Sequence, residues 1–348
     1  MNYLGFDVHK RTISYCVRHP DGTILQEGSI PALRETLDIL LTNLPGPCLA
    51  GMEATLFTAW VYDHLGMRGV QVKVAHPAML KAIFTSKRKN DEIDARKLAD
   101  LLRCNYFPEC YIADRKIRDR RRVLRYRNTL VRQCTQTKNK MAGMLMETGV
   151  PYNKQRLHTS KTYFEELLET KSALMPEGLP RLLRLGRNVV EILRSMNRQL
   201  VHVLETDPVL AERVARLMTI PGVGIILALT WALEIGDVAR FASIKAAISY
   251  CGLCGAEQSS AGKSQRTPIS KQRNKHLQTT LIEAAKVAPR WHAEYALLYD
   301  QEKQKGNRNR ATLAIARKLV SYLLAIDRGQ RVFLARVPMN TEAQSRTA

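Results

Sequence analysis

The N-terminal part of the chain alternates short apolar stretches with helical patterns, and the order of these segments restricts the fold more than any other feature of the sequence. Residues 3–8, 12–18 and 23–30 are rich in apolar and β-branched side chains and are predicted strands. Residues 19–22, His-Pro-Asp-Gly, are typical of a turn, because the proline presets φ and the glycine takes the position that needs conformational freedom. The three strands are therefore expected to form consecutive antiparallel hairpins.

Helices and strands are predicted to alternate in the segments that follow. Leucines recur at helical spacing in residues 31–44. Residues 48–53 are predicted to form a short apolar strand, residues 57–67 a helix and residues 70–75 another strand. Beyond them the chain is again helical and reaches Asp91. Three strands, then helix, strand, helix, strand and helix, is the order of the ribonuclease H fold, so an α/β domain of this kind is expected at the N-terminus.

Four carboxylates fall where that fold carries its catalytic acids, which are the first strand, the end of the fourth strand and a later helix. Asp7 and Glu53 end the two strands, and Asp91 and Asp94 are neighbours on one helical face, where they repel each other unless a cation lies between them. Mg²⁺ prefers such oxygen ligands, and a two-metal site needs several carboxylates from different elements. Taken alone, residues 87–97 are more simply a solvated helix with paired charges. The two strand carboxylates shift the balance towards a metal site.

Composition indicates a folded protein with a polyanionic partner. The 348 residues suffice for two or three domains, 45% of them are hydrophobic, and the net charge is +22. Nucleic acid is the leading candidate partner, with an acidic membrane surface as the alternative. The longest apolar run, residues 225–233, is shorter than the roughly 20 residues that span a bilayer, and the charged start does not resemble a signal peptide. Seven cysteines without a framework spacing fit reduced thiols, so a cytoplasmic protein is expected.

A strongly basic segment follows the N-terminal domain. Residues 115–140 carry eleven basic side chains and one acid, Asp119. This density favours a long helix that follows a phosphate backbone over a merely solvated helix of a coiled coil, although the two are compatible. The phosphate contacts are expected from four arginines: Arg120, Arg121, Arg122 and Arg125.

Two later features concern packing and phosphate binding. Residues 182–205 are predicted to form a helix with an apolar seam, which serves either internal packing or a dimer interface. Residues 220–225, Ile-Pro-Gly-Val-Gly-Ile, resemble the hairpin of a helix-hairpin-helix element, in which Gly222 and Gly224 let a phosphate approach backbone N–H groups. A tight turn between two core helices is the alternative. The apolar seam of the helix predicted over residues 182–205 comprises Val189, Leu193, Met196, Leu200 and Val203.

The second informative stretch is a polar loop at residues 252–275. Paired serines, Ser259 and Ser260, stand among small residues, and no acid occurs from residue 258 to residue 282. This is the setting that a serine needs to attack a phosphodiester, although a flexible loop that only contacts phosphate fits as well. The expected phosphate ligands are Lys263, Arg266, Lys271 and Arg273.

At this point the chain resembles a known family, the DEDD-type insertion-sequence transposases described as bridge-RNA-guided recombinases, with the related pilin-gene invertases. The resemblance covers nearly the whole chain through short motifs in a specific order. They are G-F-D-V-H-K at 5–10, G-M-E-A-T at 51–55, D-x-x-D-A at 91–95, I-P-G-V-G at 220–224, and S-S-x-G-K at 259–263 followed by I-S-K at 269–271.

The resemblance implies an architecture of three domains. Residues 1–110 would form a RuvC-like domain, residues 111–206 a basic coiled-coil region, residues 207–335 a mostly α-helical transposase domain, and residues 336–348 a disordered tail. The four acids of the first domain would hold Mg²⁺ or Mn²⁺. The nucleophile would be Ser259, with Ser260 as the second choice.

The resemblance also implies a mechanism and partners. The serine would form a covalent phosphoserine intermediate with DNA, in active sites composed from two subunits of a dimer or tetramer. A structured guide RNA would pair with donor and target DNA in the bacterial nucleoid. Two other functions remain open, namely a metal-dependent nuclease or junction resolvase that uses water, and a non-catalytic RNA- or DNA-binding protein.

Overall fold

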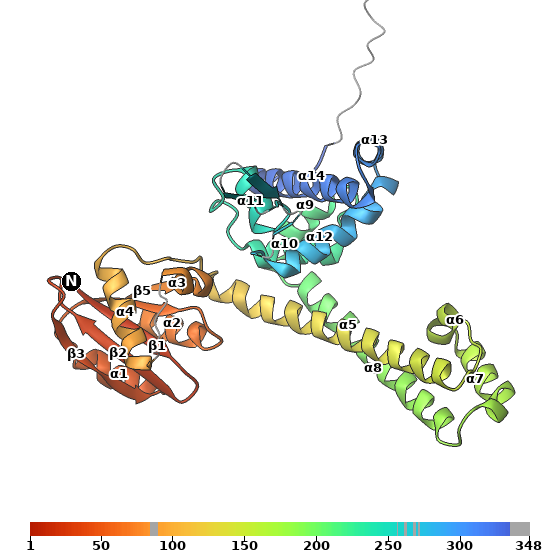
Figure 1. Ribbon diagram of the computed structural model, residues 1–348, viewed down its shortest axis with the longest axis horizontal. Helices are drawn as coiled ribbons and strands as arrows, with labels where there is room; N and C mark the ends of the chain where they lie inside the picture. Colours follow the sequence, from red (N-terminus) through yellow and green to blue (C-terminus); the bar gives the residue numbers. More distant parts are fainter. Residues whose placement is uncertain (84–89, 256, 261–262, 267–268, 271, 335–348) are drawn as a thin grey trace, which may run out of the picture. The chain divides into compact units, whose positions relative to one another are not determined.

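The computed structural model describes residues 1–83, 90–255, 257–260, 263–266, 269–270 and 272–334. The chain forms two compact units, Met1–Arg115 and Lys116–Ala348, which are described separately (Figure 1). The tail predicted to be disordered, residues 336–348, lies outside the described residues, as do residues 87–89 and Lys271.

The first unit is built on a five-stranded sheet of order β3-β2-β1-β4-β5. The two hairpins β1–β2 and β2–β3 are antiparallel, whereas β1–β4 and β4–β5 are parallel. The predicted strands are thereby confirmed, and both parallel pairs bring carboxyl ends to the same edge. The strands are β1 (Asn2–Val8), β2 (Thr12–Arg18), β3 (Ile24–Pro31), β4 (Cys48–Glu53) and β5 (Gln71–Ala75).

Helices cover both faces of this sheet. One face packs its alternate residues, among them Leu4 and Phe6, into a core with α1 (Arg34–Thr42) and α2 (Thr58–Met67). The opposite face packs against α4 (Asp91–Arg103), and α3 (Pro77–Ile83) follows β5. The first unit is therefore a mixed α/β layer structure.

Two paired glycines allow α4 to lie very close to the sheet. Gly5 and Gly51 are partners across β1 and β4. A Cβ atom at Gly5 would lie 2.1 Å from the Ala95 carbonyl oxygen and 2.5 Å from the Ala99 nitrogen, and one at Gly51 would lie 2.7 Å from Leu102 Cδ1. Larger residues at either glycine would push the helix away. The short distance to the sheet brings the N-terminal end of α4 to the end of β1.

The second unit begins with a helical arm. Its helices α5 and α8 pack through buried side chains such as Met141 and Leu183, and Gly186 of α8 faces Met141. The predicted basic helix is confirmed and continues beyond residue 140. The helices of the arm are α5 (Arg115–Glu147), α6 (Lys154–Thr159), α7 (Lys161–Thr170), the 3₁₀ turn η1 (Ser172–Leu174) and α8 (Leu179–Glu205).

A helical bundle with a large apolar core completes the second unit. The fully buried Trp231 and Tyr295 lie in this core. The polar loop between α11 and α12, expected without regular structure, contains a two-stranded hairpin. No helix in the described part of the chain has the length and apolar composition that crossing a bilayer requires. The elements are α9 (Ala211–Met218), α10 (Ile225–Ile235), α11 (Ile244–Tyr250), β6 (Glu257–Ser260), β7 (Lys263–Arg266), α12 (Lys275–Val287), η2 (Ala288–Arg290), α13 (Ala293–Gln304) and α14 (Arg308–Gly329).

Candidate active site

The carboxyl ends of β1 and β4 place two of the predicted acids side by side. Phe6 pairs with Met52, so the next residues, Asp7 and Glu53, end adjacent parallel strands. Because strand side chains alternate between faces, both acids belong to the face that also carries Gly5. This is the face covered by α4.

The first turn of α4 supplies the other two acids. Asn90 caps the helix, since its side-chain oxygen accepts a hydrogen bond from the Glu92 backbone nitrogen at 3.2 Å. Asp91 and Asp94 lie in the turn that follows, where the partial positive charge of a helix N-terminus favours carboxylates. Asp94 also accepts a hydrogen bond from Lys97 Nζ at 3.0 Å. The cap and the close helix packing together fix these acids beside β1.

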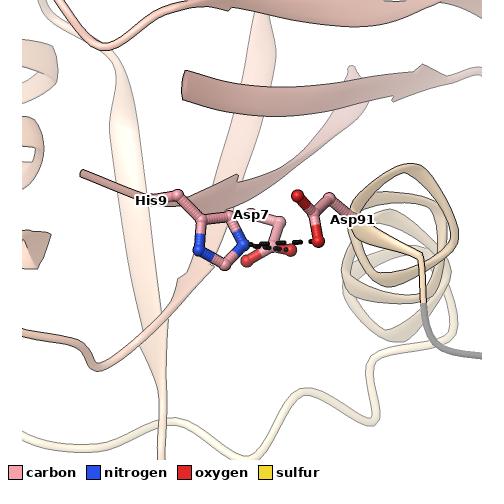
Figure 2. A group of neighbouring side chains, drawn as sticks. All are labelled: Asp7, His9 and Asp91. Carbon is pink, nitrogen blue, oxygen red and sulfur yellow. Dashed lines mark hydrogen bonds and ion pairs between the residues drawn. The ribbon is translucent and has the colours of Figure 1, made fainter. Parts of the chain in front are cut away.

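A histidine that the sequence interpretation did not use joins this site. His9 Nε2 lies 3.1 Å from Asp7 Oδ2 and 3.5 Å from Asp91 Oδ1, so the imidazole connects the two carboxylates (Figure 2). Within the described residues, Asp7, His9 and Asp91 form the group whose possible ligand atoms all lie within 4.8 Å of one another. Glu53 and Asp94 are outside that group. The signal for His9 was its place two residues after Asp7 in the first motif.

The electrostatics of the cluster are those of a site for a cation. Burial raises the pKa of Asp7, its contact with the His9 imidazole opposes that shift, and the charges of Asp91 and Asp94 raise the pKa further. The ionised Asp7 therefore costs free energy in this environment. A divalent ion would relieve that cost, and the two carboxylates are suitable ligands for it. The residues of the cluster therefore fit a divalent metal ion.

The predicted nucleophiles lie in the second unit, in a hairpin with defined backbone pairing. In β6, Ser259 is the partner of Ser264 and Ser260 is the partner of Lys263 in β7. Lys263 is exposed. Arg273 follows the hairpin and donates a hydrogen bond from Nη1 to the Ser270 carbonyl oxygen at 3.0 Å.

The two ends of the serine loop are tied together. The Asn274 backbone nitrogen donates to the Tyr250 carbonyl oxygen at 3.0 Å, and Gln278 Nε2 donates to the Gly252 carbonyl oxygen at 2.7 Å. Gly252 has φ +71°, and a Cβ atom there would lie 2.3 Å from Arg273 Cβ. The hairpin therefore projects from a closed and tightly packed base.

A buried carboxylate connects this base to the basic helix. Glu234 in α10 is 1% exposed and accepts two hydrogen bonds of 2.8 Å from Arg125. Asn274 Nδ2 donates to the same carboxylate at 2.9 Å, and Arg121 Nε lies 3.8 Å away. Although burial alone would raise the pKa of Glu234, these partners hold it below its usual value.

Three of the four arginines predicted to contact phosphate thus bind residues far along the chain in the second unit. Arg121 and Arg125 bind α10, and Arg120 donates to Asp207 at 2.8 Å. Arg122 pairs with Asp119 but remains 67% exposed. The structure gives the first three arginines a role in holding α5 against the C-terminal helices, a role that the sequence interpretation missed.

The glycines of the turn between α9 and α10 differ in their surroundings. Gly222 has φ +81°, and a Cβ atom there would lie 2.8 Å from Ala288 Cβ, so conformation and packing both explain this glycine. Gly224 is exposed, has no atom close to its Cβ position and precedes the first residue of α10. Conformation and packing account for the first glycine, whereas neither accounts for the second, which is open to solvent.

Comparisons with known proteins agree with this arrangement. A transposase model for DEDD enzymes matches residues 4–150, which include the four acids, and a model described as the transposase IS116/IS110/IS902 family matches residues 214–300, which include the serine hairpin. These matches define the class: the chain is a DNA transposase, an enzyme that cleaves and rejoins DNA strands.

Curated relatives are of the same kind over most of their length. The transposase for insertion sequence element IS1328 of Yersinia enterocolitica is 28% identical over 82% of this chain and 83% of its own. The transposase for insertion sequence element IS1111A of Coxiella burnetii is 25% identical over 93% of this chain and 88% of its own. The chain belongs to the IS110/IS116 family of DEDD transposases. The kinship with pilin-gene invertases stays a prediction.

Proposed function

We propose that this transposase exchanges DNA strands under the guidance of an RNA, through a covalent phosphoserine intermediate. The observation that carries the proposal is the meeting of Asp7 and Asp91 at the carboxyl edge of the sheet. The sheet order, β3-β2-β1-β4-β5, supports a RuvC-like domain of the ribonuclease H type. DNA as the substrate follows from the family.

Asp7, Glu53, Asp91 and Asp94 are proposed to hold Mg²⁺ or Mn²⁺. Asp7 and Asp91 are already close enough for shared coordination, and the other two acids are supplied by the neighbouring strand and the next helical turn. A bound metal ion would neutralise charge that develops on the phosphate. Lys97 holds the Asp94 carboxylate in place until then.

Ser259 is proposed as the nucleophile, with Ser260 as the second choice. The serine hydroxyl loses its proton while its oxygen forms a bond to a DNA phosphorus, the bond from that phosphorus to one deoxyribose oxygen breaks, and the released oxygen takes up a proton to become a hydroxyl. Attack of another strand's hydroxyl on the phosphoserine reverses these steps and joins the strands. The closed base of the hairpin and the exposed Lys263, which pairs with Ser260 at the far end of the hairpin, support a role in presenting the serine to phosphate.

A denaturing gel tests the serine mechanism. Purified protein, RNA transcribed from the flanks of the element, Mg²⁺ and labelled donor and target DNA should give a covalent protein–DNA adduct. We expect Ser259→Ala to remove the adduct and Ser260→Ala to retain it. The reverse result would move the assignment to Ser260, whereas cleaved DNA without any adduct would favour the nuclease that uses water.

A homo-oligomer is proposed from an exposed apolar stripe on α8. Its residues recur at heptad spacing and are 36–58% exposed, which is typical of a helix that pairs with another helix. The predicted seam is divided, because Leu193 packs against the arm's own core whereas Val189, Met196 and Val203 belong to the stripe. The stripe comprises Leu182, Leu185, Val189, Ile192, Met196 and Val203.

Introduction of negatively charged side chains into this apolar stripe should separate the subunits. We expect the double variant Leu185→Glu/Ile192→Glu to reduce the mass measured by light scattering to that of a monomer, because two buried carboxylates per helix would be unpaired. Arg198→Glu makes the same change in net charge on another side of α8 and should keep the oligomer. Equal masses for all three proteins would contradict an interface at α8.

A further inference from the structure

The loop after β4 presents a leucine to solvent next to the acidic site. Leu56 is 90% exposed, more than any other large apolar side chain in the described residues, and stands three positions after Glu53. Single exposed leucines are common and need no explanation. The surroundings of Leu56 distinguish it from them.

The backbone on both sides of Leu56 is held by hydrogen bonds. Thr58 Oγ1 donates to the Glu53 carbonyl oxygen at 2.8 Å and accepts from the Thr55 backbone nitrogen at 2.7 Å. The Phe57 backbone nitrogen donates to Thr55 Oγ1 at 3.2 Å, and the Phe57 ring packs against the core under α1 and α2. Leu56 therefore stands in a loop whose neighbouring residues are held in place by hydrogen bonds.

The edge of the sheet around Leu56 also carries basic and apolar side chains, which lie beside the acids of the site. Carboxyl ends of β1, β4 and β5 meet there, since the strands are parallel. Exposed Lys10 and Arg11 follow β1, and α3 after β5 carries exposed Lys81 and the 54% exposed Met79. Basic and apolar side chains at one edge suit a nucleic acid, because the basic side chains contact its phosphates and the apolar side chains contact its bases.

We propose that Leu56 is a wedge that inserts between two DNA bases beside the phosphate bound at the acidic site. Apolar side chains inserted in this way partly unstack a base step and bend the duplex. A phosphate that reaches Asp7 and Asp91 brings its own bases to this edge, where the ordered loop holds the leucine in their path. Unstacking there gives the scissile phosphate freedom to turn towards the nucleophile. The inference rests on the proposed strand exchange at the same site.

Fluorescence of 2-aminopurine tests the wedge. The base analogue is placed beside the mapped cleavage position in donor DNA, and the complex of full-length protein and RNA is formed in Ca²⁺, so that unstacking is read without cleavage. We expect a severalfold rise in fluorescence with wild-type protein and with Leu56→Met. Leu56→Ala should lose the rise, bind DNA within about twofold of wild type, and slow cleavage in Mg²⁺ by about 10–100-fold.

The matched control is Ile39→Ala. Ile39 is 62% exposed on α1, which covers the other face of the same sheet, so its truncation removes a similar apolar surface away from the acids. It should behave as wild type. Equal fluorescence and cleavage for Leu56→Ala and Ile39→Ala would overturn the wedge, as would a fall in oligomer mass in Leu56→Ala with unchanged fluorescence, which would assign Leu56 to a protein contact.

Failure of the wedge and failure of the serine mechanism give different results. A wild-type protein that forms the adduct without raising fluorescence overturns the wedge alone. A rise that depends on Leu56 in a protein that never forms the adduct supports the wedge and contradicts the phosphoserine intermediate.

Discussion

Replacement of Asp7 by asparagine is expected to abolish strand exchange and, in EDTA, to raise the melting temperature. The loss of activity should be at least about 10²–10³-fold, the cost of removing one electrostatic group from an active site. The gain in stability has a separate cause. Burial of Asp7, with Asp91 and Asp94 nearby, disfavours its ionised form, and asparagine keeps the shape without the charge.

The gain in melting temperature of Asp7→Asn over wild type should increase with pH. Because the folded-state pKa of Asp7 is raised above its usual 3.8, the stability from its protonated form is present below that value and is lost as the pH rises through the folded-state pKa. Melting curves of wild type and Asp7→Asn in EDTA should therefore coincide more closely near pH 3.8 and diverge towards neutral pH.

Addition of Mg²⁺ supplies the control for this prediction. The ion should raise the melting temperature of wild type, since it binds only the folded site, and should have little effect on Asp7→Asn. Asp300→Asn changes an exposed carboxylate of α13 and should respond to Mg²⁺ as wild type does. If Asp7→Asn melted below wild type in EDTA, the acids would not repel one another as described here.

Local patterns in the sequence were sufficient for the sheet and its acids. Alternating apolar residues and a Pro–Gly turn predict the hairpins, and the order of segments places Asp7 and Glu53 at strand ends. The same patterns did not single out His9, although it stands two residues after Asp7 in the first motif. A single histidine beyond a strand has no periodicity, and only the close approach of α4 over Gly5 brings Asp91 within 3.5 Å of its ring.

Charge density was harder to interpret than periodicity. Arginines crowded on α5 indicated phosphate contacts, but the acid that binds Arg125 is 109 positions away in the sequence, in a helix that is otherwise apolar. No local pattern connects such residues. The helix α13 was also missed, although its Tyr295 is fully buried in the bundle. Long-range pairing therefore decides which basic residues remain free for nucleic acid.

Replacement of Glu234 by glutamine is expected to lower the free energy of unfolding of the second unit by about 3 kcal/mol. Removal of one partner from a buried ion pair leaves the other charge uncompensated and costs about 3–5 kcal/mol. The expected value is at the low end of this range because the Arg125 side chain is 47% exposed and regains water. Arg121, whose side chain is 19% exposed, recovers less. Denaturant titration followed by circular dichroism measures the change.

Acidic pH should reduce the difference in free energy of unfolding between wild type and Glu234→Gln. The folded-state pKa of Glu234 lies below its usual 4.5, so the stability that its ionised form contributes is present above that value and is lost as the pH falls through the folded-state pKa. Wild type and Glu234→Gln should therefore differ most at neutral pH and converge in acid. A difference that stayed constant with pH would assign the effect to packing rather than to the ion pair.

Glu212→Gln is the control for this variant, because it removes a carboxylate that is 87% exposed and pairs with Arg216 on the surface. Its effect should stay within about 1 kcal/mol at every pH. The Glu234 variant should also form less phosphoserine adduct than its residual stability explains, since Asn274 and Arg125 must then share the single amide oxygen of glutamine at the base of the serine loop. Normal adduct formation in a destabilised Glu234→Gln protein would show that Asn274 holds the loop through the Tyr250 carbonyl alone.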